Sequence, residues 1–251
     1  MESLITYPGG KFYMLKDIIE IYDKNRSKAF VDVFGGSGKV LMNIDSKIKV
    51  YNDIDDSIIN FFDIVIKNKK ELLDRLNYVL NSRVLFNRYK HPGKNKIDDA
   101  FRYLYLNILS FNGQRESYSY SLKRNKSIKL TRIGNLIDAH YDKIKLWAIE
   151  HMDFKELIKK YDSEQTFFYL DPPYHGITGL YEHNLKSQDY IELKNILDNI
   201  KGRYLLNINE DAFILNTFGE PQLRKEYTNF GVNSKLGGKS KRIELFYWNY
   251  S

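Results

Sequence analysis

The chain has 251 residues, of which 43% are hydrophobic and 28% charged. This composition is typical of a globular protein with a sizeable apolar core and excludes a disordered chain or a small stapled scaffold. The absence of cysteine excludes disulfides, thiolate zinc sites and a cysteine nucleophile. The N-terminal residues lack a secretory signal pattern, and no apolar run approaches the ~20 residues of a membrane helix, so we expect a soluble, cytoplasmic protein without membrane contact.

The net charge of +7 is placed unevenly along the chain. Residues 83–132 carry 12 Lys and Arg against three acidic residues, a balance of +9 that leaves −2 for the remainder. A basic block in a nearly neutral chain indicates a surface for a polyanion, because each neutralised phosphate releases counterions. The alternative is a solvated face that only keeps the protein soluble.

The first part of the chain alternates between strand and helix patterns. Apolar residues at helical spacing predict a helix over 12–22, and the apolar run 29–34 predicts a strand that leads into the glycine cluster 35–38. After a short helix-compatible stretch, residues 48–55 read as a second strand and residues 57–67 as a helix. Two strands separated by a helix indicate a parallel βαβ unit.

The alternation stops between about residues 67 and 143, where helical patterns and basic polar loops take over. It resumes at 145–154, and after a helical stretch the run 166–170 predicts a buried strand. A helix is expected from Ser187, as its N-cap, to a stop at Gly202.

Two last strand patterns, at 203–209 and 242–250, complete the sheet. The simplest architecture is an open α/β sheet interrupted by a helical, basic insertion.

The strand predicted at 29–34 ends with Asp32 and Phe34, and the loop after it carries Gly36 and Gly38. It lacks the pattern of a Walker phosphate loop, and Leu41 stands where a dinucleotide fingerprint needs its third glycine. Glycines still let a ligand approach the backbone, and Asp53 after the next strand can accept hydrogen bonds from ribose hydroxyls. The loop therefore predicts a nucleoside site, with a tight turn that binds nothing as the alternative.

The segment Asp171-Pro172-Pro173-Tyr174 follows the strand predicted at 166–170. Two prolines remove two backbone donors and stiffen the chain, so the Asp171 carboxylate and the Pro172 carbonyl can be displayed as fixed acceptors beside an aromatic ring. Such a cluster suits an exocyclic amino group on a stacked base. A rigid turn with a capping Asp is the alternative.

Four segments occur in a fixed order along the chain. They are Tyr7-Pro8-Gly9-Gly10-Lys11, residues 30–38 with the sequence FVDVFGGSG, Asn52-Asp53-Ile54-Asp55 and Asp171-Pro172-Pro173-Tyr174. Two further stretches, residues 103–113 and residues 237–239, match the same pattern more loosely. In these segments and their order the chain resembles the Dam-like (D12 class) adenine-N6-specific DNA methyltransferases, which use S-adenosylmethionine.

The resemblance implies a Rossmann-like S-adenosylmethionine-dependent methyltransferase sheet, an α/β fold with a helical, basic target-recognition insertion. The catalytic core would be residues 1–66 and 144–251, and the DNA-binding insertion residues 67–143. The cofactor contacts that we expect are Tyr7, Lys11, Asp32, Phe34, Gly35, Gly36, Gly38, Asp53, Ile54 and Asp171. The expected catalytic residues are Asp171, Pro172, Pro173 and Tyr174, and the expected DNA contacts are Asn112, Gly113, Arg115, Arg124, Lys126 and Lys129.

The resemblance also predicts the activity, which is methylation of N6 of an adenine flipped out of duplex DNA. Direct transfer needs no metal, and the scattered histidines show no metal-ligand spacing. The expected partners are double-stranded DNA and a cognate restriction endonuclease, in the cytoplasm of a prokaryote or of a virus-infected host cell. Two alternatives remain, an RNA adenine or other amino-group methyltransferase and a non-catalytic nucleic-acid-binding regulator.

Overall fold

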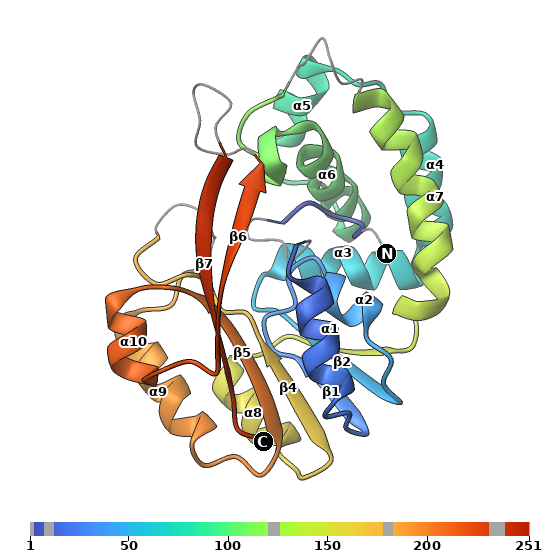
Figure 1. The fold of residues 1–251 in the computed structure, drawn as a ribbon. Coiled ribbons are helices and arrows are strands. Elements are labelled where there is room, and N and C mark those ends of the chain that lie inside the picture. The colour runs from blue at the N-terminus through green and yellow to red at the C-terminus, as the bar shows by residue number, and fades with distance from the viewer. Residues whose placement is uncertain (1–2, 8–12, 120–125, 178–182, 231–238, 251) are drawn as a thin grey trace.

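Figure 1 shows the computed structural model of the chain, which describes residues 3–7, 13–119, 126–177, 183–230 and 239–250. The strands of this described part form one seven-stranded sheet in the order β3-β2-β1-β4-β5-β7-β6. Their bounds are β1 Ala29–Asp32, β2 Ile48–Asn52, β3 Trp147–Glu150, β4 Thr166–Leu170, β5 Arg203–Asn209, β6 Leu223–Phe230 and β7 Lys239–Trp248. Strands β1 to β5 are parallel, whereas β7 runs antiparallel to β5 and β6. This confirms the expected Rossmann-like α/β sheet.

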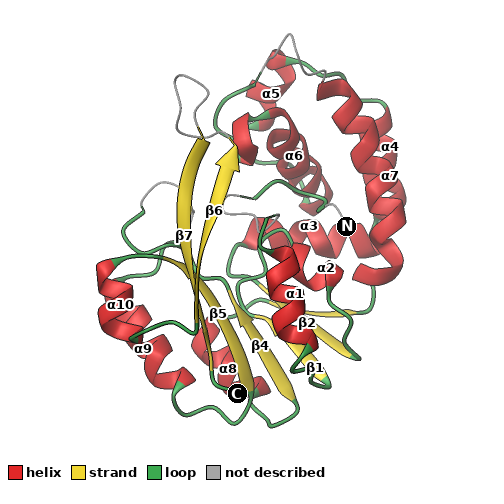
Figure 2. Cartoon of the chain, viewed as in Figure 1, coloured by secondary structure: helices red, strands yellow, loops and turns green. Residues whose placement is uncertain are grey.

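Helices cover both faces of the sheet (Figure 2). They are α1 Leu15–Asp23, α2 Lys39–Asn43, α3 Asp56–Lys67, α4 Lys69–Asn77, α5 Arg83–Tyr89, α6 Lys96–Leu109, α7 Lys126–Ile144, α8 Phe154–Tyr161, α9 Ser187–Leu197 and α10 Ala212–Phe218, with a 3-10 turn at Phe111–Gly113. One apolar cluster joins α1, α2 and α3 to the sheet through Phe30 and Phe167, and a second joins α8, α9 and α10 through Phe168.

The helices α4 to α7 gather on the side of α3, away from α9 and α10 (Figure 1). Their buried residues, such as Phe86 and Leu104, belong to the same apolar cluster as α3 and Phe30. The segment therefore packs on the sheet domain through a shared core. The proposed division at residues 66/67 and 143/144 stays a prediction.

Two elements were absent from the sequence prediction, namely α10 and β6. Strand β6 contains Arg224, Lys225 and Glu226 and lies at the edge of the sheet, paired only with β7 among the described strands. An edge strand with charged side chains has weak apolar alternation, which hides it from pattern analysis. The Ser187 prediction was wrong by one residue, because Ser187 is the first helical residue and Lys186 precedes it as the cap.

The strand order reverses at β1, which lies between β2 and β4. In open parallel sheets, ligands bind in the crevice beyond the carboxyl ends of the strands at such a reversal. The glycine loop follows β1, Asp53 follows β2 and Asp171 follows β4. The topology thus brings three separate sequence motifs to one edge of the sheet.

Candidate active site

The glycine loop turns sharply after β1. Gly36 has a φ of 48°, a left-handed conformation that favours glycine. Its N–H donates to Asp53 Oδ2 at 2.7 Å, and Tyr51 Oη donates to its carbonyl at 2.7 Å. A Cβ at Gly36 would lie 3.0 Å from the ring of Tyr7. The loop is therefore shaped by its own neighbours, and Tyr7 lies directly against it as the cofactor prediction requires.

Asp53 is a buried carboxylate with an exposed apolar neighbour. It is 8% exposed, and its second oxygen accepts a hydrogen bond from the Asp55 N–H at 3.0 Å. Burial raises the pKa of Asp53 to about 6. Ile54, the next residue, is 45% exposed. Since each carboxylate oxygen has a second lone pair, Asp53 can still accept from ribose hydroxyls while Ile54 offers an apolar surface to a base.

Asp32 and Asp171 add two more carboxylates at this edge. Asp32 is 2% exposed, and burial raises its pKa well above the usual range, with the negative charges of Asp171 and Asp53 as further causes. The carboxylates after β2 and β4 therefore both act on Asp32 at the end of β1. Like charges disfavour ionisation, so a ligand with a positive charge would be stabilised here.

Asn52 is a site residue whose role the sequence did not predict. Its side-chain amide donates to the carbonyls of Val33 at 2.9 Å and Met152 at 3.1 Å, and its carbonyl oxygen accepts from Met152 N–H at 3.0 Å. These bonds tie the end of β2 to the loops after β1 and β3. Met152 is 100 residues away along the chain, so no local pattern signals the contact.

The Asp171–Tyr174 segment continues from β4, whose five residues are all buried. Tyr190 Oη of α9 donates to the Pro173 carbonyl, which holds the segment from one side. Tyr174 is 3% exposed and donates its hydroxyl to Glu244 Oε1 at 2.6 Å. The Pro173 carbonyl is engaged inside the protein, so the acceptors predicted for an amino group remain the Asp171 carboxylate and the Pro172 carbonyl.

His175 follows this segment directly. Its Nδ1 lies 3.0 Å from Asp211 Oδ1, its Nε2 lies 3.1 Å from Ser187 Oγ, and its ring stacks on Phe213 with centroids 4.3 Å apart. Both ring nitrogens and one ring face therefore have partners. His175 holds the start of α9 and α10 near the segment, and Ser187 bonds to it instead of capping the helix.

The N-terminal segment is bonded to the end of α6. Asn107 Oδ1 accepts from Thr6 N–H at 2.8 Å, and its amide donates to the Thr6 carbonyl at 2.7 Å and the Gly113 carbonyl at 3.2 Å. Gly113 has a φ of 76°, and a Cβ there would lie 2.4 Å from the Thr6 carbonyl oxygen. The sequence similarity around Asn107 and Gly113 thus corresponds to a clamp on the residues before Tyr7. Lys11 lies outside the described residues.

Arg115 has the one positive φ among non-glycine residues of the described ranges, at 64°. Its N–H donates to Ser110 Oγ at 2.9 Å, and its guanidinium lies 4.6 Å from the ring centre of Tyr103. A left-handed conformation is uncommon for arginine and is often found at functional sites. Of the other predicted DNA contacts, Gly113 lies in the clamp, Arg124 lies outside the described residues, and the side chains of Asn112, Lys126 and Lys129 are likewise not described.

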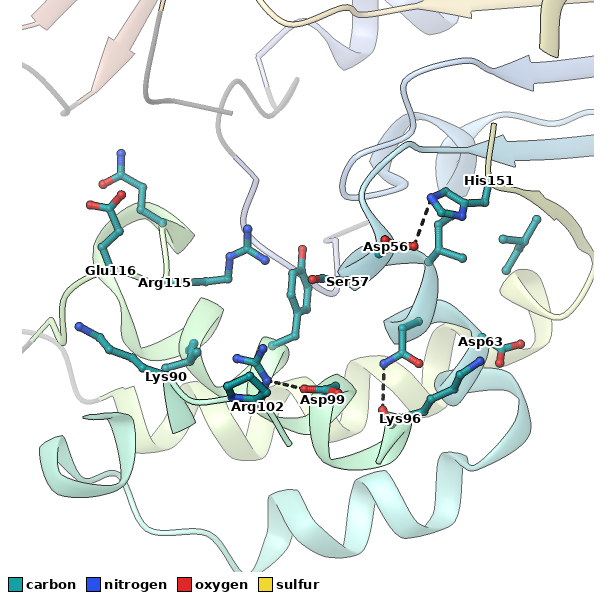
Figure 3. Close-up of a pocket in the computed structure, with 17 residues that line it drawn as sticks. Asp56, Ser57, Asp63, Lys90, Lys96, Asp99, Arg102, Arg115, Glu116 and His151 are labelled. Atoms are coloured by element: carbon teal, nitrogen blue, oxygen red, sulfur yellow. Dashed lines mark hydrogen bonds and ion pairs between the residues drawn. The ribbon is translucent and has the colours of Figure 1, made fainter. Parts of the chain in front are cut away.

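Arg115 lines a pocket of about 920 Å³ between α3 and the insertion. Figure 3 shows Asp56 and Asp63 on the α3 side, and Lys90 and Arg102 with Arg115 on the insertion side. The α3 wall is acidic, whereas the insertion wall carries more cations than acids, since Asp99 and Glu116 lie among its Lys and Arg residues.

Neither a metal centre nor a membrane helix is found among the described residues. No group of three or more His, Asp or Glu side chains there has an arrangement suited to a metal ion. None of the described helices has the length and apolar character required to cross a bilayer.

The sequence is similar to a known protein family and to several individual methyltransferases. A sequence profile of the D12 class N6 adenine-specific DNA methyltransferase family matches residues 7–225. Modification methylase StsI of Streptococcus sanguinis is 25% identical over 204 residues, 72% of this chain and 30% of the relative. Type II methyltransferase M.CviBI of Paramecium bursaria Chlorella virus NC1A is 19% identical over 263 residues and is matched over 100% of both chains. The chain therefore spans under a third of one relative and the whole of the other.

Among solved structures, the rRNA methyltransferase aviRa from Streptomyces viridochromogenes is similar to this chain. The TM-score is 0.46 and the identity 10%, over 99% of this chain and 90% of that one.

Proposed function

Because the chain belongs to the D12 class N6 adenine-specific DNA methyltransferase family, we propose that it methylates N6 of adenine at a specific site in duplex DNA. The observation that carries the proposal is the position of Asp171–Tyr174 at the end of β4, beside the glycine loop and Asp53. The methyl donor in this proposal is S-adenosylmethionine, and the catalytic residues are Asp171, Pro172, Pro173 and Tyr174.

The residues at the carboxyl edge fit this cofactor. When bound, S-adenosylmethionine supplies a methyl group on a positively charged sulfur. The buried carboxylates of Asp32 and Asp53 and the partly buried Asp171 suit a cation, because burial and then the negative charges of Asp171 and Asp53 raise the pKa of Asp32. Asp53 would hold the ribose and Ile54 the adenine ring. The remaining predicted contacts are Tyr7, Lys11, Phe34, Gly35, Gly36 and Gly38.

The chain's own part in the chemistry is to orient the substrate amino group. The Asp171 carboxylate and the Pro172 carbonyl accept the two amino hydrogens, which favours a pyramidal nitrogen whose lone pair points away from them. Holding that lone pair in line with the incoming methyl group is orientation catalysis, and no covalent enzyme intermediate is required.

Access to this site requires the adenine to leave the duplex, at a cost of a few kcal/mol. Tyr174 would stack on the flipped base. Since its side chain is 3% exposed, a stacked base must displace a neighbour. The guanidinium of Arg242, 5.9 Å from the ring centre, is the candidate.

DNA would be held by the insertion, residues 67–143. Arg83, Arg88 and Lys94 are exposed there, as phosphate contacts must be, and Arg115 faces the pocket next to the cofactor edge. The relatives named as modification methylase and type II methyltransferase support a restriction-modification role with a cognate endonuclease. Such a role places the protein in the cytoplasm with its DNA.

Expression in a host that lacks adenine methylation tests the proposal. We expect sequencing to map N6-methyladenine to one short DNA motif, and the Asp171→Asn variant, expressed at the same level, to leave that motif unmethylated. Methylation confined to RNA would replace the DNA substrate by RNA. Purified protein that binds DNA but transfers no methyl group to either nucleic acid would support a regulator instead.

A further inference from the structure

We propose that Glu244 is a positioning residue for methyl transfer, which acts by fixing the ring of Tyr174. The proposal rests on the proposed function and adds a residue that none of the sequence motifs contains. Glu244 lies on β7, 70 residues from Tyr174 along the chain, and is 0% exposed. Glutamate is rarely buried to this extent without specific partners.

Two of the side chains that bond to Glu244 lie on or beside the neighbouring strands of the sheet. Its Oε1 accepts the hydroxyl of Tyr174 at 2.6 Å, and its Oε2 accepts the amide of Asn207 at 3.1 Å. Asn207 is 0% exposed and lies on β5, between β4 and β7 in the sheet. The chain of bonds thus ties the segment after β4 to two neighbouring strands.

Glu244 belongs to a group of polar side chains on one face of the sheet. Phe30, Tyr169, Leu205 and Phe246 belong to a single apolar cluster, one from each of β1, β4, β5 and β7. Side chains two residues apart share a strand face, so this face continues toward the carboxyl edge with Asp32, Asp171, Asn207 and Glu244. The apolar face therefore becomes polar at the edge where the substrate amino group is expected. Glu244 lies on this same face, in register with Asn209 of β5, whereas Asn207 is in register with Phe246.

The bond between Glu244 and Tyr174 suits a positioning role because it restrains the ring of a residue that lies in a loop. Tyr174 lies beyond the end of β4, so sheet hydrogen bonds do not fix its ring. A short bond from a phenol to a carboxylate is stronger than one between neutral groups and restrains the ring. The Asn207 Oδ1 atom accepts no hydrogen bond from the described residues, so Glu244 also sets the orientation of that amide.

The test combines a neutral variant with a matched rescue. In Glu244→Gln, the bond from the Tyr174 hydroxyl loses the carboxylate charge that strengthens it, and one acceptor oxygen becomes an amide donor. Adding Asn207→Asp returns a carboxylate to the pair and gives the new amide donor an acceptor. We expect the single-turnover rate of Glu244→Gln on saturating DNA to fall about tenfold, the order of one missing hydrogen bond, and the double variant to recover most of it. The Kd for S-adenosylmethionine should stay unchanged.

A second cycle uses Tyr174→Phe, which removes the hydroxyl and keeps the ring. If Glu244 acts through that hydroxyl, Glu244→Gln has little further effect on the rate in the Tyr174→Phe protein. Tyr161→Phe is the matched control, because Tyr161 Oη donates to Glu150 Oε1 at 2.5 Å in the same domain, outside the proposed site. The control should keep the wild-type rate.

Three outcomes separate the possibilities. A Glu244→Gln protein that is folded at the assay temperature and transfers methyl at the wild-type rate overturns the positioning role. So does an equal loss of rate with and without the Tyr174 hydroxyl. Wild-type protein that methylates no nucleic acid overturns the proposed function, and the role of Glu244 with it.

Discussion

The carboxyl edge of the sheet and the helical insertion differ in the sign of their charges and in how deeply those charges are buried. At the edge, Asp32, Asp53 and Glu244 are buried, and Asp53 and Glu244 are each fixed by hydrogen bonds to specific partners. In the insertion, Arg83 and Arg88 are exposed. Buried charges are costly and must be placed individually, whereas exposed charges act together and can replace one another. Single substitutions should therefore be severe at the edge and mild in the insertion.

The acidic residues of the insertion follow the surface pattern. Arg75 bonds to Asp98 and lowers its pKa, and Arg102 bonds to Asp99 at 2.6 Å. The first pair joins α4 to α6, the second joins neighbouring turns of α6, and both compensate charge locally. The excess of cations remains available for a polyanion.

The largest effect is expected from Asp171→Asn. The substitution keeps size but turns an acceptor oxygen into a donor that opposes the substrate amino group. We expect single-turnover methyl transfer to fall by about 100-fold or more, the usual loss when one preorganised catalytic hydrogen bond is removed. Rapid-quench assays with saturating DNA measure it. Near-normal transfer would reduce the segment to a structural turn.

Asp53→Ala should act mainly on cofactor affinity. Loss of the ribose contacts and of the bond to Gly36 should weaken S-adenosylmethionine binding by about 1 to 3 kcal/mol, or roughly 5- to 150-fold. Calorimetry measures the affinity. Asp56→Ala is the control, since the Asp56 side chain is 94% exposed and lies three residues away. Equal affinities for both variants would exclude Asp53 from the cofactor site.

The pH dependence of stability tests whether Asp53 is buried as the structure shows. Its pKa is raised from 3.8 to about 6 in the folded protein, so its stabilising contribution is complete below the unfolded value and is lost as pH rises through 6. Relative to Asp53→Asn, which does not titrate, the wild type should lose about 1 to 3 kcal/mol of unfolding free energy between pH ~4 and ~7. Urea unfolding of both proteins measures the difference. Parallel curves would mean that Asp53 is solvated.

Asn107→Ala tests the contact between the two regions. It removes the paired bonds to Thr6, next to Tyr7, and should lower cofactor affinity about fivefold through a less ordered N-terminal segment. Asn60→Ala is the control, because Asn60 also joins α3 to the insertion, through the Lys96 carbonyl at 2.8 Å, without touching that segment. If both variants bind the cofactor like the wild type, the clamp serves the fold only.

The smallest effect per residue is expected from the cations of the insertion, so three of them are substituted together. Neutralising Arg124, Lys126 and Lys129 together should reduce the salt dependence of DNA binding by about one unit for each phosphate that is no longer neutralised, with cofactor affinity unchanged. Neutralising the exposed Lys24, Lys159 and Lys201 outside the insertion is the control. Identical salt slopes for the two triple variants would make the basic block a solvated surface.

The sequence by itself determined the parts of the site that are local in the chain. The strand at 29–34, the glycine loop, Asp53 and the strand before Asp171 were predicted, because a buried parallel strand is a short apolar run and its carboxyl end is the next residue. Placing Asp53 and Asp171 at one edge follows from the parallel topology. The basic block at 83–132 was likewise evident from the sequence, because charge can be counted without any knowledge of the fold.

Only the tertiary structure decided which polar groups are buried and what they bind. Glu244 sits in a strand of charged and aromatic residues and gives no signal of its own, yet it is 0% exposed and holds Tyr174. Asn52 and Asn107 find their partners 100 and 101 residues away. Periodicity assigns a side chain to a face of its own strand or helix, but burial and hydrogen bonding depend on what the rest of the chain packs against that face.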